Sequence, residues 1–269
     1  MCINRLFIRW VLSGFCLVAG PLFALQSRIW AGDSEKRVEG TYSRELLGGV
    51  QVRDNAGKNC LVRFEDLSIA DLNYLKYRIS PKISIEVDHS FRQLPRTEWS
   101  REDDDNFVYT FDVSVQKKSK LPYRGDLTAE LFVLGDERLV DDDSRLVLMS
   151  YKKAGFVFPE EEKAHFDFSL SGVTFSAYRA GWILVQSAVE RGKTYRGYIA
   201  AVSDSEGQLI EVETDLKLDW MTDDLPNTVN KLRQFYQEHP GSAQSRHFNS
   251  SFKKLEPPRI PWFQRNPSE

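Results

Sequence analysis

The sequence predicts a mostly β protein in two parts, a small β module and a larger β-sandwich, followed by a C-terminal helix. Three observations support this fold class. Apolar and polar residues alternate over long stretches, which is the period of half-buried strands. Gly, Asn and Asp recur between these stretches, as turns require. A largely acidic stretch without apolar periodicity, residues 96–106, predicts a linker between the two parts.

The first 31 residues have the layout of a secretory signal. They contain no acidic residue and three basic ones, Arg5, Arg9 and Arg28, and residues 10–25 form an apolar run. We therefore expect an exported protein, periplasmic or extracellular, cleaved after Ala31, with Ala24 as an earlier candidate position. The alternative is a retained N-terminal membrane anchor. The run is shorter than the ~20 residues needed to span a bilayer, and Pro21 weakens a spanning helix.

Removal of this signal would change both the cysteine count and the charge. Cys2 and Cys16 would be lost, so Cys60 would be the single thiol and the mature monomer could form no internal disulfide. Basic residues would fall from 36 to 33 against 39 acidic ones, which moves the net charge from −3 to −6. An acidic chain is a poor candidate for binding nucleic acid. The one basic cluster is expected in a solvated turn and comprises Lys117, Lys118 and Lys120.

The small module is expected at residues 36–95. Strands are predicted over residues 37–42, 49–53 and 59–64, with a turn at residues 54–57. Ser68 is placed to cap a short helix in which Asp71 stands three residues later, an acidic variant of the capping box. Pro81 ends this helix, and residues 82–87 predict the last strand of the module.

Part of this module resembles a known family. The residues that carry the resemblance are 48–57, 62–68, Asp71 and Tyr74 with Leu75. This pattern is similar to the small SH3-like Sla-one homology domain, named after a yeast endocytic adaptor and found in exported proteins of Planctomycetes and Verrucomicrobia-type bacteria. The match covers about residues 38–76. The family usually has an aromatic residue ahead of its first strand, and the chain has none between Ala31 and that strand. The resemblance implies an SH3-like fold and a peptide or protein partner, without assigning any binding residue.

The larger part is expected to be an immunoglobulin-like β-sandwich over residues 107–220. In residues 107–115, Phe107, Tyr109 and Phe111 fall on one face and polar residues on the other. Similar patterns predict strands over residues 127–134, 145–151, 165–175, 195–203 and 208–214, and favour one over residues 181–190. Seven or so strands with turns between them are typical of a sandwich. Residues 225–239 predict a helix opened by Pro226, and residues 240–269 an extended tail.

Local signatures of catalysis are missing from the sequence. It contains no nucleophile elbow, zinc helix, phosphate-binding loop or dinucleotide fingerprint, so we expect no catalytic, cofactor or metal site. The four histidines are scattered without ligand spacing: His89, His165, His239 and His247. We expect His165 to face solvent. A Cys60/His89 dyad is conceivable within one module, but a lone cysteine in a strand is more typical of a buried structural residue.

Two further groups of residues are candidate sites. Acidic runs at residues 102–105, 141–143 and 160–162 could bind calcium or supply carboxylates for hydrolysis, although such runs are usually solvated turns. Five aromatic residues could line a carbohydrate or peptide surface, although packing in the core is more usual: Tyr178, Trp182, Tyr195, Tyr198 and Trp220.

Together these observations predict an exported, non-catalytic binding or adaptor protein of the bacterial envelope, with a protein or peptide partner and no nucleic acid. Two alternatives remain at this point. One is a carboxylate-dependent hydrolase that acts on an envelope or extracellular polymer. The other is a membrane-anchored structural component, in which the apolar run stays in the bilayer.

Overall fold

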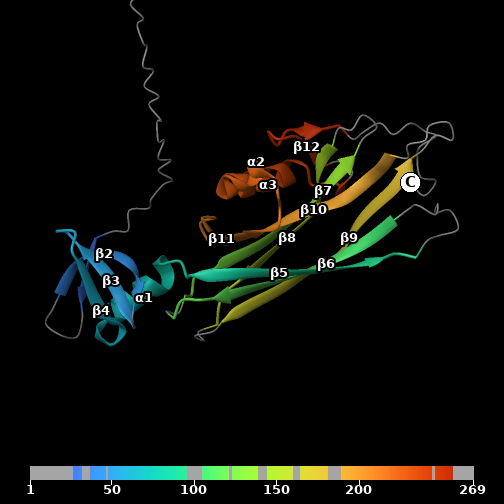
Figure 1. The fold of residues 1–269 in the computed structure, drawn as a ribbon. Helices are drawn as coiled ribbons and strands as arrows, with labels where there is room; N and C mark the ends of the chain where they lie inside the picture. Colours follow the sequence, from blue (N-terminus) through green and yellow to red (C-terminus); the bar gives the residue numbers. More distant parts are fainter. Residues whose placement is uncertain are drawn as a thin grey trace, which may run out of the picture. The chain divides into compact units, whose positions relative to one another are not determined.

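The protein is mostly β, as predicted. The computed structural model describes residues 27–31, 37–46, 48–95, 105–120, 123–138, 144–159, 164–180, 189–243 and 246–256. The chain divides into two compact units, with the division between Asp71 and Leu72. The described strands form a four-stranded antiparallel sheet and a nine-stranded antiparallel sheet, with short helices near the C-terminus (Figure 1).

The small sheet is a simple meander in the order β1-β2-β3-β4. Its strands are β1 (Arg28–Ala31), β2 (Arg37–Leu46), β3 (Gly49–Asp54) and β4 (Asn59–Arg63). The three predicted strands and the turn at residues 54–57 are confirmed. The Asp54 carboxylate closes that turn by accepting the N–H groups of Ala56 and Lys58 at 3.0 and 2.7 Å. The sequence did not predict β1, which falls inside the segment assigned to the signal.

A capping box begins the first helix, as the spacing of Ser68 and Asp71 predicts. After the 3-10 turn η1 (Phe64–Asp66), α1 runs from Ile69 to Arg78. The N–H of Asp71 donates to Ser68 Oγ at 3.1 Å, and the N–H of Ser68 donates to Asp71 Oδ2 at 3.3 Å. Two orphan N–H groups at the helix start are thereby satisfied.

The predicted boundary of the small module at residue 95 is wrong. β5 (Ile83–Gln93) pairs along its whole length with β6 (Asp105–Lys117) and so belongs to the large sheet. The physical reason is a shared buried face, because Ile83 and Ile85 join the apolar cluster of the large sheet.

The linker predicted over residues 96–106 ends earlier than expected, because Asp105 and Asn106 already belong to β6. Residues 96–104 lie outside the described chain.

The large sheet has the order β13-β12-β8-β7-β10-β9-β6-β5, and β11 also pairs with β10. The remaining strands are β7 (Leu127–Arg138), β8 (Ser144–Phe156), β9 (His165–Ala180), β10 (Val189–Asp204), β11 (Leu209–Thr214), β12 (His247–Phe248) and β13 (Lys254–Leu255). Every strand predicted between residues 107 and 175, and the hairpin of residues 195–214, is confirmed. The strand favoured over residues 181–190 lies mostly outside the described chain.

Two apolar clusters cover the two faces of β7 and β10. On one face, Leu131, Val133 and Ala200 pack with residues of β5, β6 and β9. On the other face, Phe132, Leu134 and Ile199 pack against helices α2 (Asp219–Thr222) and α3 (Leu225–Glu238). Figure 1 shows the helices on the side of β7 and β10 that is opposite β5 and β6. The predicted C-terminal helix is confirmed, with Asp224 as its N-cap.

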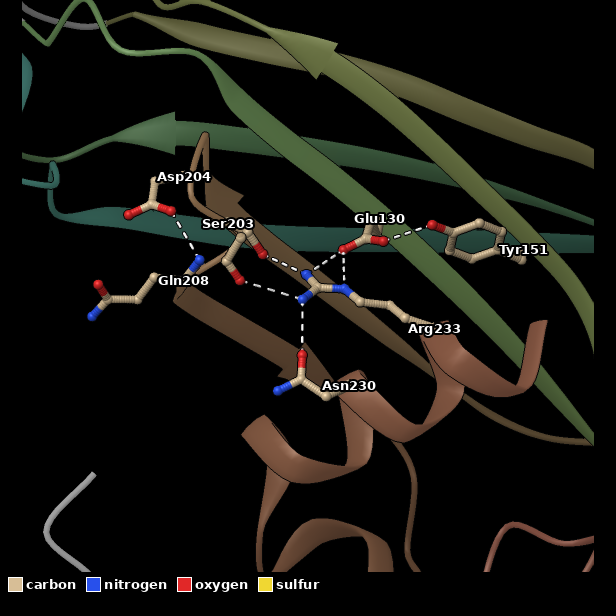
Figure 2. A network of polar contacts seen from close by, with 8 residues as sticks. Glu130, Tyr151, Ser203, Asp204, Gln208, Asn230 and Arg233 are labelled. Atoms are coloured by element: carbon tan, nitrogen blue, oxygen red, sulfur yellow. Dashed lines mark hydrogen bonds and ion pairs between the residues drawn. The ribbon is translucent and has the colours of Figure 1, made fainter. Parts of the chain in front are cut away.

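A buried polar network fixes α3 to the sheet (Figure 2). Arg233 of α3 forms an ion pair with Glu130 of β7, whose side chain is 2% exposed, with Nε 2.8 Å from Oε2. Tyr151 of β8 donates to the other carboxylate oxygen at 2.6 Å, and Arg233 also donates to Ser203 and to Asn230. Both charges are paired and hydrogen-bonded, as burial of an ion pair requires.

The predicted extended tail after residue 240 is wrong for residues 246–256. His247 and Phe248 form β12, which pairs with Val147 and Leu146 of β8, and β13 pairs with β12. Phe248 is 1% exposed and enters the cluster under the helices. The apolar gain from this burial explains why a Ser- and Asn-rich segment is ordered here. Trp262 and Phe263 of the predicted tail lie outside the described residues.

Candidate functional site

Six aromatic side chains form a continuous row on one face of the large sheet, on the side of the apolar cluster shared by β5, β6 and β9. We call this set the aromatic row: His89 and Phe91 of β5, Phe107, Tyr109 and Phe111 of β6, and Tyr195 of β10. The register of β5 and β6 creates it, because His89 lies opposite Phe111 and Phe91 lies opposite Tyr109. Cross-strand neighbours on one face of a sheet are close enough for their rings to touch.

The aromatic row runs from the buried core to the surface. Phe111 is fully buried, Tyr109 and Tyr195 are half-buried, and Phe91 is 61% exposed. Tyr109 links these parts, since its ring centroid lies 5.0 Å from that of Tyr195 and 5.3 Å from that of Phe91. β5 is also the last strand of the sheet, so among the described strands β6 is its one hydrogen-bonded neighbour. An exposed ring therefore stands on an edge strand.

Asp215, just after β11, anchors the inner end of the row. One carboxylate oxygen accepts the Tyr195 hydroxyl at 2.6 Å, and the other accepts the N–H of Tyr198 at 2.7 Å. Gly197 makes room for this contact at a bulge in β10, where its φ of 152° also favours glycine. A Cβ at this position would lie 2.9 Å from Asp215 Oδ1.

The environment of these tyrosines keeps their hydroxyls protonated. Burial raises the pKa of Tyr195 far above its usual 10, and the hydrogen bond to Asp215 raises it further. Burial, followed by the charges of Asp215 and Glu213, raises the pKa of Tyr198 to about 12. Burial also raises the pKa of Tyr109. The tyrosines therefore offer neutral rings and hydroxyls to a ligand, and they do not act as bases near neutral pH.

The structure brings together only part of the aromatic set singled out from the sequence. Tyr195 belongs to the aromatic row, and Tyr198 adjoins it, with its ring centroid 6.4 Å from that of Phe111. Trp220 lies elsewhere, on α2, where it contacts Phe252 with ring centroids 5.5 Å apart. The side chain of Tyr178 and all of Trp182 lie outside the described residues. The sequence prediction did not place His89 or Phe91 among these aromatic residues, and named His89 only as a partner of Cys60. Continued alternation in residues 83–91 is the signal that could have identified both.

The Cys60/His89 pair is not brought into one module. Cys60 lies in β4 of the small sheet and is partly exposed, not buried as expected. His89 lies in β5 of the large sheet and stacks on Phe111, with centroids 5.7 Å apart. The premise of the dyad, that both residues belong to residues 36–95 as one unit, is therefore wrong. His165 is exposed, as predicted from its place on the polar face of β9.

A buried His–Glu pair was missed by sequence reasoning. His247 is 1% exposed and its Nε2 contacts the Glu137 carboxylate of β7, which is also buried. These residues lie 110 positions apart in the sequence, so no local pattern indicates the contact. Arg246 beside it donates to the carbonyl of Met149 at 2.9 Å, and burial lowers the pKa of Arg246. This cluster attaches the C-terminal segment to the sheet.

The predicted basic turn is not fully solvated. Lys117, the last residue of β6, is only 4% exposed. Together with Lys118 and Lys120 it lines a polar hollow of about 580 Å³ that also contacts His165. Lys118 donates to Gln116 at 2.9 Å, and Lys117 and Lys120 also have interaction partners. The lysines are therefore engaged within the protein.

The acidic runs lie outside the described residues except for Asp105, which accepts a hydrogen bond from Gln93 at 2.8 Å. Within the ranges that the structure describes, no group of three or more His, Cys, Asp or Glu side chains is arranged to hold a metal ion. Among the same residues, no helix is long and apolar enough to cross a membrane.

Comparison with known proteins identifies no family. No protein-family model matches the chain, and neither does any curated protein. Among solved structures, the chain is similar to a protein from Akkermansia muciniphila, at 17% identity over 52% of this chain and 73% of that one, with a TM-score of 0.25. It is also similar to the structural genomics target SoR45, at 11% identity over 50% of this chain and 86% of that one, with a TM-score of 0.21. A β-glucosidase from Kluyveromyces marxianus in complex with glucose matches at 12% identity over 50% of this chain and 14% of that one, with a TM-score of 0.20.

Proposed function

We propose that this is an exported, non-catalytic binding protein that holds an extended polypeptide segment along β5, over the aromatic row. The observation that carries the proposal is Phe91, a ring that is 61% exposed on the last strand of the sheet. β11 packs beside β5, but among the described strands only β6 is hydrogen-bonded to it, and the unpaired backbone N–H and C=O groups of such an edge strand can pair with an added strand. Exposed rings beside that edge suit the apolar side chains of every second residue of such a strand.

A polypeptide fits this surface better than a nucleic acid. The full chain carries a net charge of −3, and the carboxylates of Asp215, Glu213 and Asp88 each raise the pKa of Tyr198. Such a field repels phosphates. The phenylalanine and tyrosine rings are neutral, so their main contribution is apolar contact, which extended peptides with alternating apolar residues supply.

The assignment of the small unit supports a protein partner. We propose that this unit is an SH3-like module related to the Sla-one homology domain. The residues that carry the resemblance form β3, β4, η1 and α1, in the order that the resemblance implies, although Tyr74 and Leu75 of α1 lie after the division between the two units. For the large unit, the predicted immunoglobulin-like sandwich stays a proposal: one apolar cluster joins β5, β6 and β9 with β7, β8 and β10, but these strands also follow one another in a single hydrogen-bonded sheet, whereas a sandwich has two. Export rests on the arginines and the apolar run of the first 31 residues.

Site-specific photo-crosslinking tests the proposed surface. A photoreactive residue replaces Ser90 on β5 in the full chain, expressed in its native envelope, and Leu61 on the small sheet, 50% exposed, is the matched control position. We expect a crosslink to an extended protein segment from position 90 and not from position 61. A synthetic peptide of that segment should bind at least tenfold more weakly to Phe91→Ala and equally well to Leu61→Ala. Equal binding to Phe91→Ala, crosslinks to glycan alone, or no crosslink specific to position 90 would each overturn the proposal.

A further inference from the structure

β1 contributes a fully buried side chain to the small unit. Residues Arg28–Ala31 pair with Arg37–Gly40 of β2, so β1 is an edge strand of the sheet. Trp30 is 0% exposed, and its indole N–H donates to the carbonyl of Gly40 at 3.0 Å. A tryptophan buried to this degree is a major part of the core of so small a unit.

β1 also supplies a charge to the start of α1. Arg28 Nη2 lies 2.6 Å from Asp71 Oδ1, and the Asp71 side chain is 1% exposed. The second oxygen of Asp71 accepts the Ser68 hydroxyl at 2.6 Å within the capping box. The Arg28 guanidinium also stands 5.0 Å above the Trp30 ring. Arg28 thus compensates a carboxylate that burial would otherwise make costly.

We propose that export processing cuts the chain before Arg28, at the peptide bond between Ala24 and Leu25, so that the mature protein keeps β1. This inference rests on the proposed export. Hydrolysis there releases residues 1–24 and leaves a new amino group on Leu25. Cleavage after Ala31, the position that the sequence favours, would remove Trp30 and Arg28 together. It would leave a cavity in the small unit and a buried Asp71 without its guanidinium partner.

The experiment is determination of the N-terminus of the exported protein. The full chain with a C-terminal tag is expressed in a Gram-negative host, and the tagged protein from each fraction is analysed by N-terminal sequencing and intact mass. We expect the exported form to begin at Leu25. An exported form that begins at Gly32, or one that keeps Met1 in the envelope, would overturn the inference without affecting export. Uncleaved protein confined to the cytoplasm would instead contradict export itself.

Two matched variants identify the bond that is cut. Ala24→Phe removes the small residue at the proposed position, and Ala31→Phe does the same at the other candidate. We expect Ala24→Phe to reduce the amount of processed protein at least tenfold and Ala31→Phe to leave the N-terminus at Leu25. The opposite pattern would overturn the inference, and the N-terminus of Ala31→Phe protein remains informative even if that variant is less stable.

Discussion

At the scale of single residues, the contact between Asp215 and Tyr195 depends on a glycine. Gly197 has a φ of 152°, and an added Cβ would crowd Asp215 Oδ1 and Leu216. Gly172, with a φ of 80° and nothing within 4 Å of an added Cβ, offers a matched control. An alanine at either position introduces backbone strain, but only an alanine at position 197 also crowds Asp215. Comparing the two variants therefore isolates the effect of that crowding.

We expect Gly197→Ala to lower the free energy of unfolding by about 1–3 kcal/mol, through backbone strain together with displacement of Asp215. Gly172→Ala should cost less, because it introduces backbone strain without crowding. Urea denaturation of both variants measures the difference. Equal losses at the two positions would mean that the space beside Asp215 contributes nothing to stability.

The raised pKa values of Tyr195 and Tyr198 predict a loss of stability at high pH. Tyr198 has an ordinary pKa of 10 in the unfolded chain and a pKa of about 12 in the folded protein. Below pH 10 the residue is protonated in both states, so its contribution is fully present. Between pH 10 and 12 only the unfolded chain loses the proton, and stability should fall by about 1.4 kcal/mol per pH unit for this residue.

Chemical denaturation at a series of pH values from 9 to 12 checks this expectation, with Tyr198→Phe as the comparison. The variant should lose stability less steeply above pH 10, because it lacks one group that ionises more readily when unfolded. Tyr195 should still contribute in both proteins, since burial and Asp215 raise its pKa as well. Parallel curves for the two proteins would contradict the raised pKa of Tyr198.

At the scale of secondary-structure elements, α3 depends on a buried charge. Arg233 of this helix forms an ion pair with Glu130 of β7, whose side chain is 2% exposed (Figure 2). We expect Arg233→Met to destabilise the large unit by about 3–5 kcal/mol, because it leaves the Glu130 carboxylate buried without its cation. The double variant Arg233→Met with Glu130→Gln should recover part of this loss, since it removes the charge as well.

Thermal denaturation of the single and double variants provides the measurement. Gln237→Met is the control, because Gln237 is an exposed residue of the same helix and its replacement should have little effect. If Arg233→Met unfolds at the same temperature as Gln237→Met, the ion pair does not stabilise the attachment of α3.

The elements that the sequence predicts best are those whose pattern is local. Alternation in residues 107–115 and the helical spacing of Val229, Leu232 and Phe235 were enough to identify β6 and α3. Pairing was not predictable in the same way, because it depends on contacts distant in the sequence. β5 was assigned to the wrong unit since its alternation suits any buried face, and β6 lies beyond the acidic stretch.

In the aromatic row too, single residues were predictable from the sequence and their contacts were not. Tyr195 and Tyr198 could be named from the sequence because they lie in a clear hairpin. Their contact with His89 could not, because it brings β5 and β10 together, two strands that are distant in the sequence and are not hydrogen-bonded neighbours in the sheet. The burial of His247 against Glu137 was hidden for the same reason.

At the scale of the whole molecule, the two units have separate sets of buried side chains. Neither apolar cluster of the large unit includes a residue before Ile83. The small unit has its own buried residues, among them Trp30, Val50 and Val52. Units with separate cores can unfold in separate transitions, and the smaller one is expected to be the less stable.

We therefore expect calorimetry of the chain that begins at Leu25 to show two transitions. Trp30→Ala should abolish or strongly lower the first one, because loss of a buried tryptophan costs about 3–5 kcal/mol, which is comparable to the whole stability of a small unit. It should leave the second transition in place. Arg233→Met should do the reverse, by lowering only the second transition. A single transition that moves with both substitutions would mean that the two units unfold as one cooperative body.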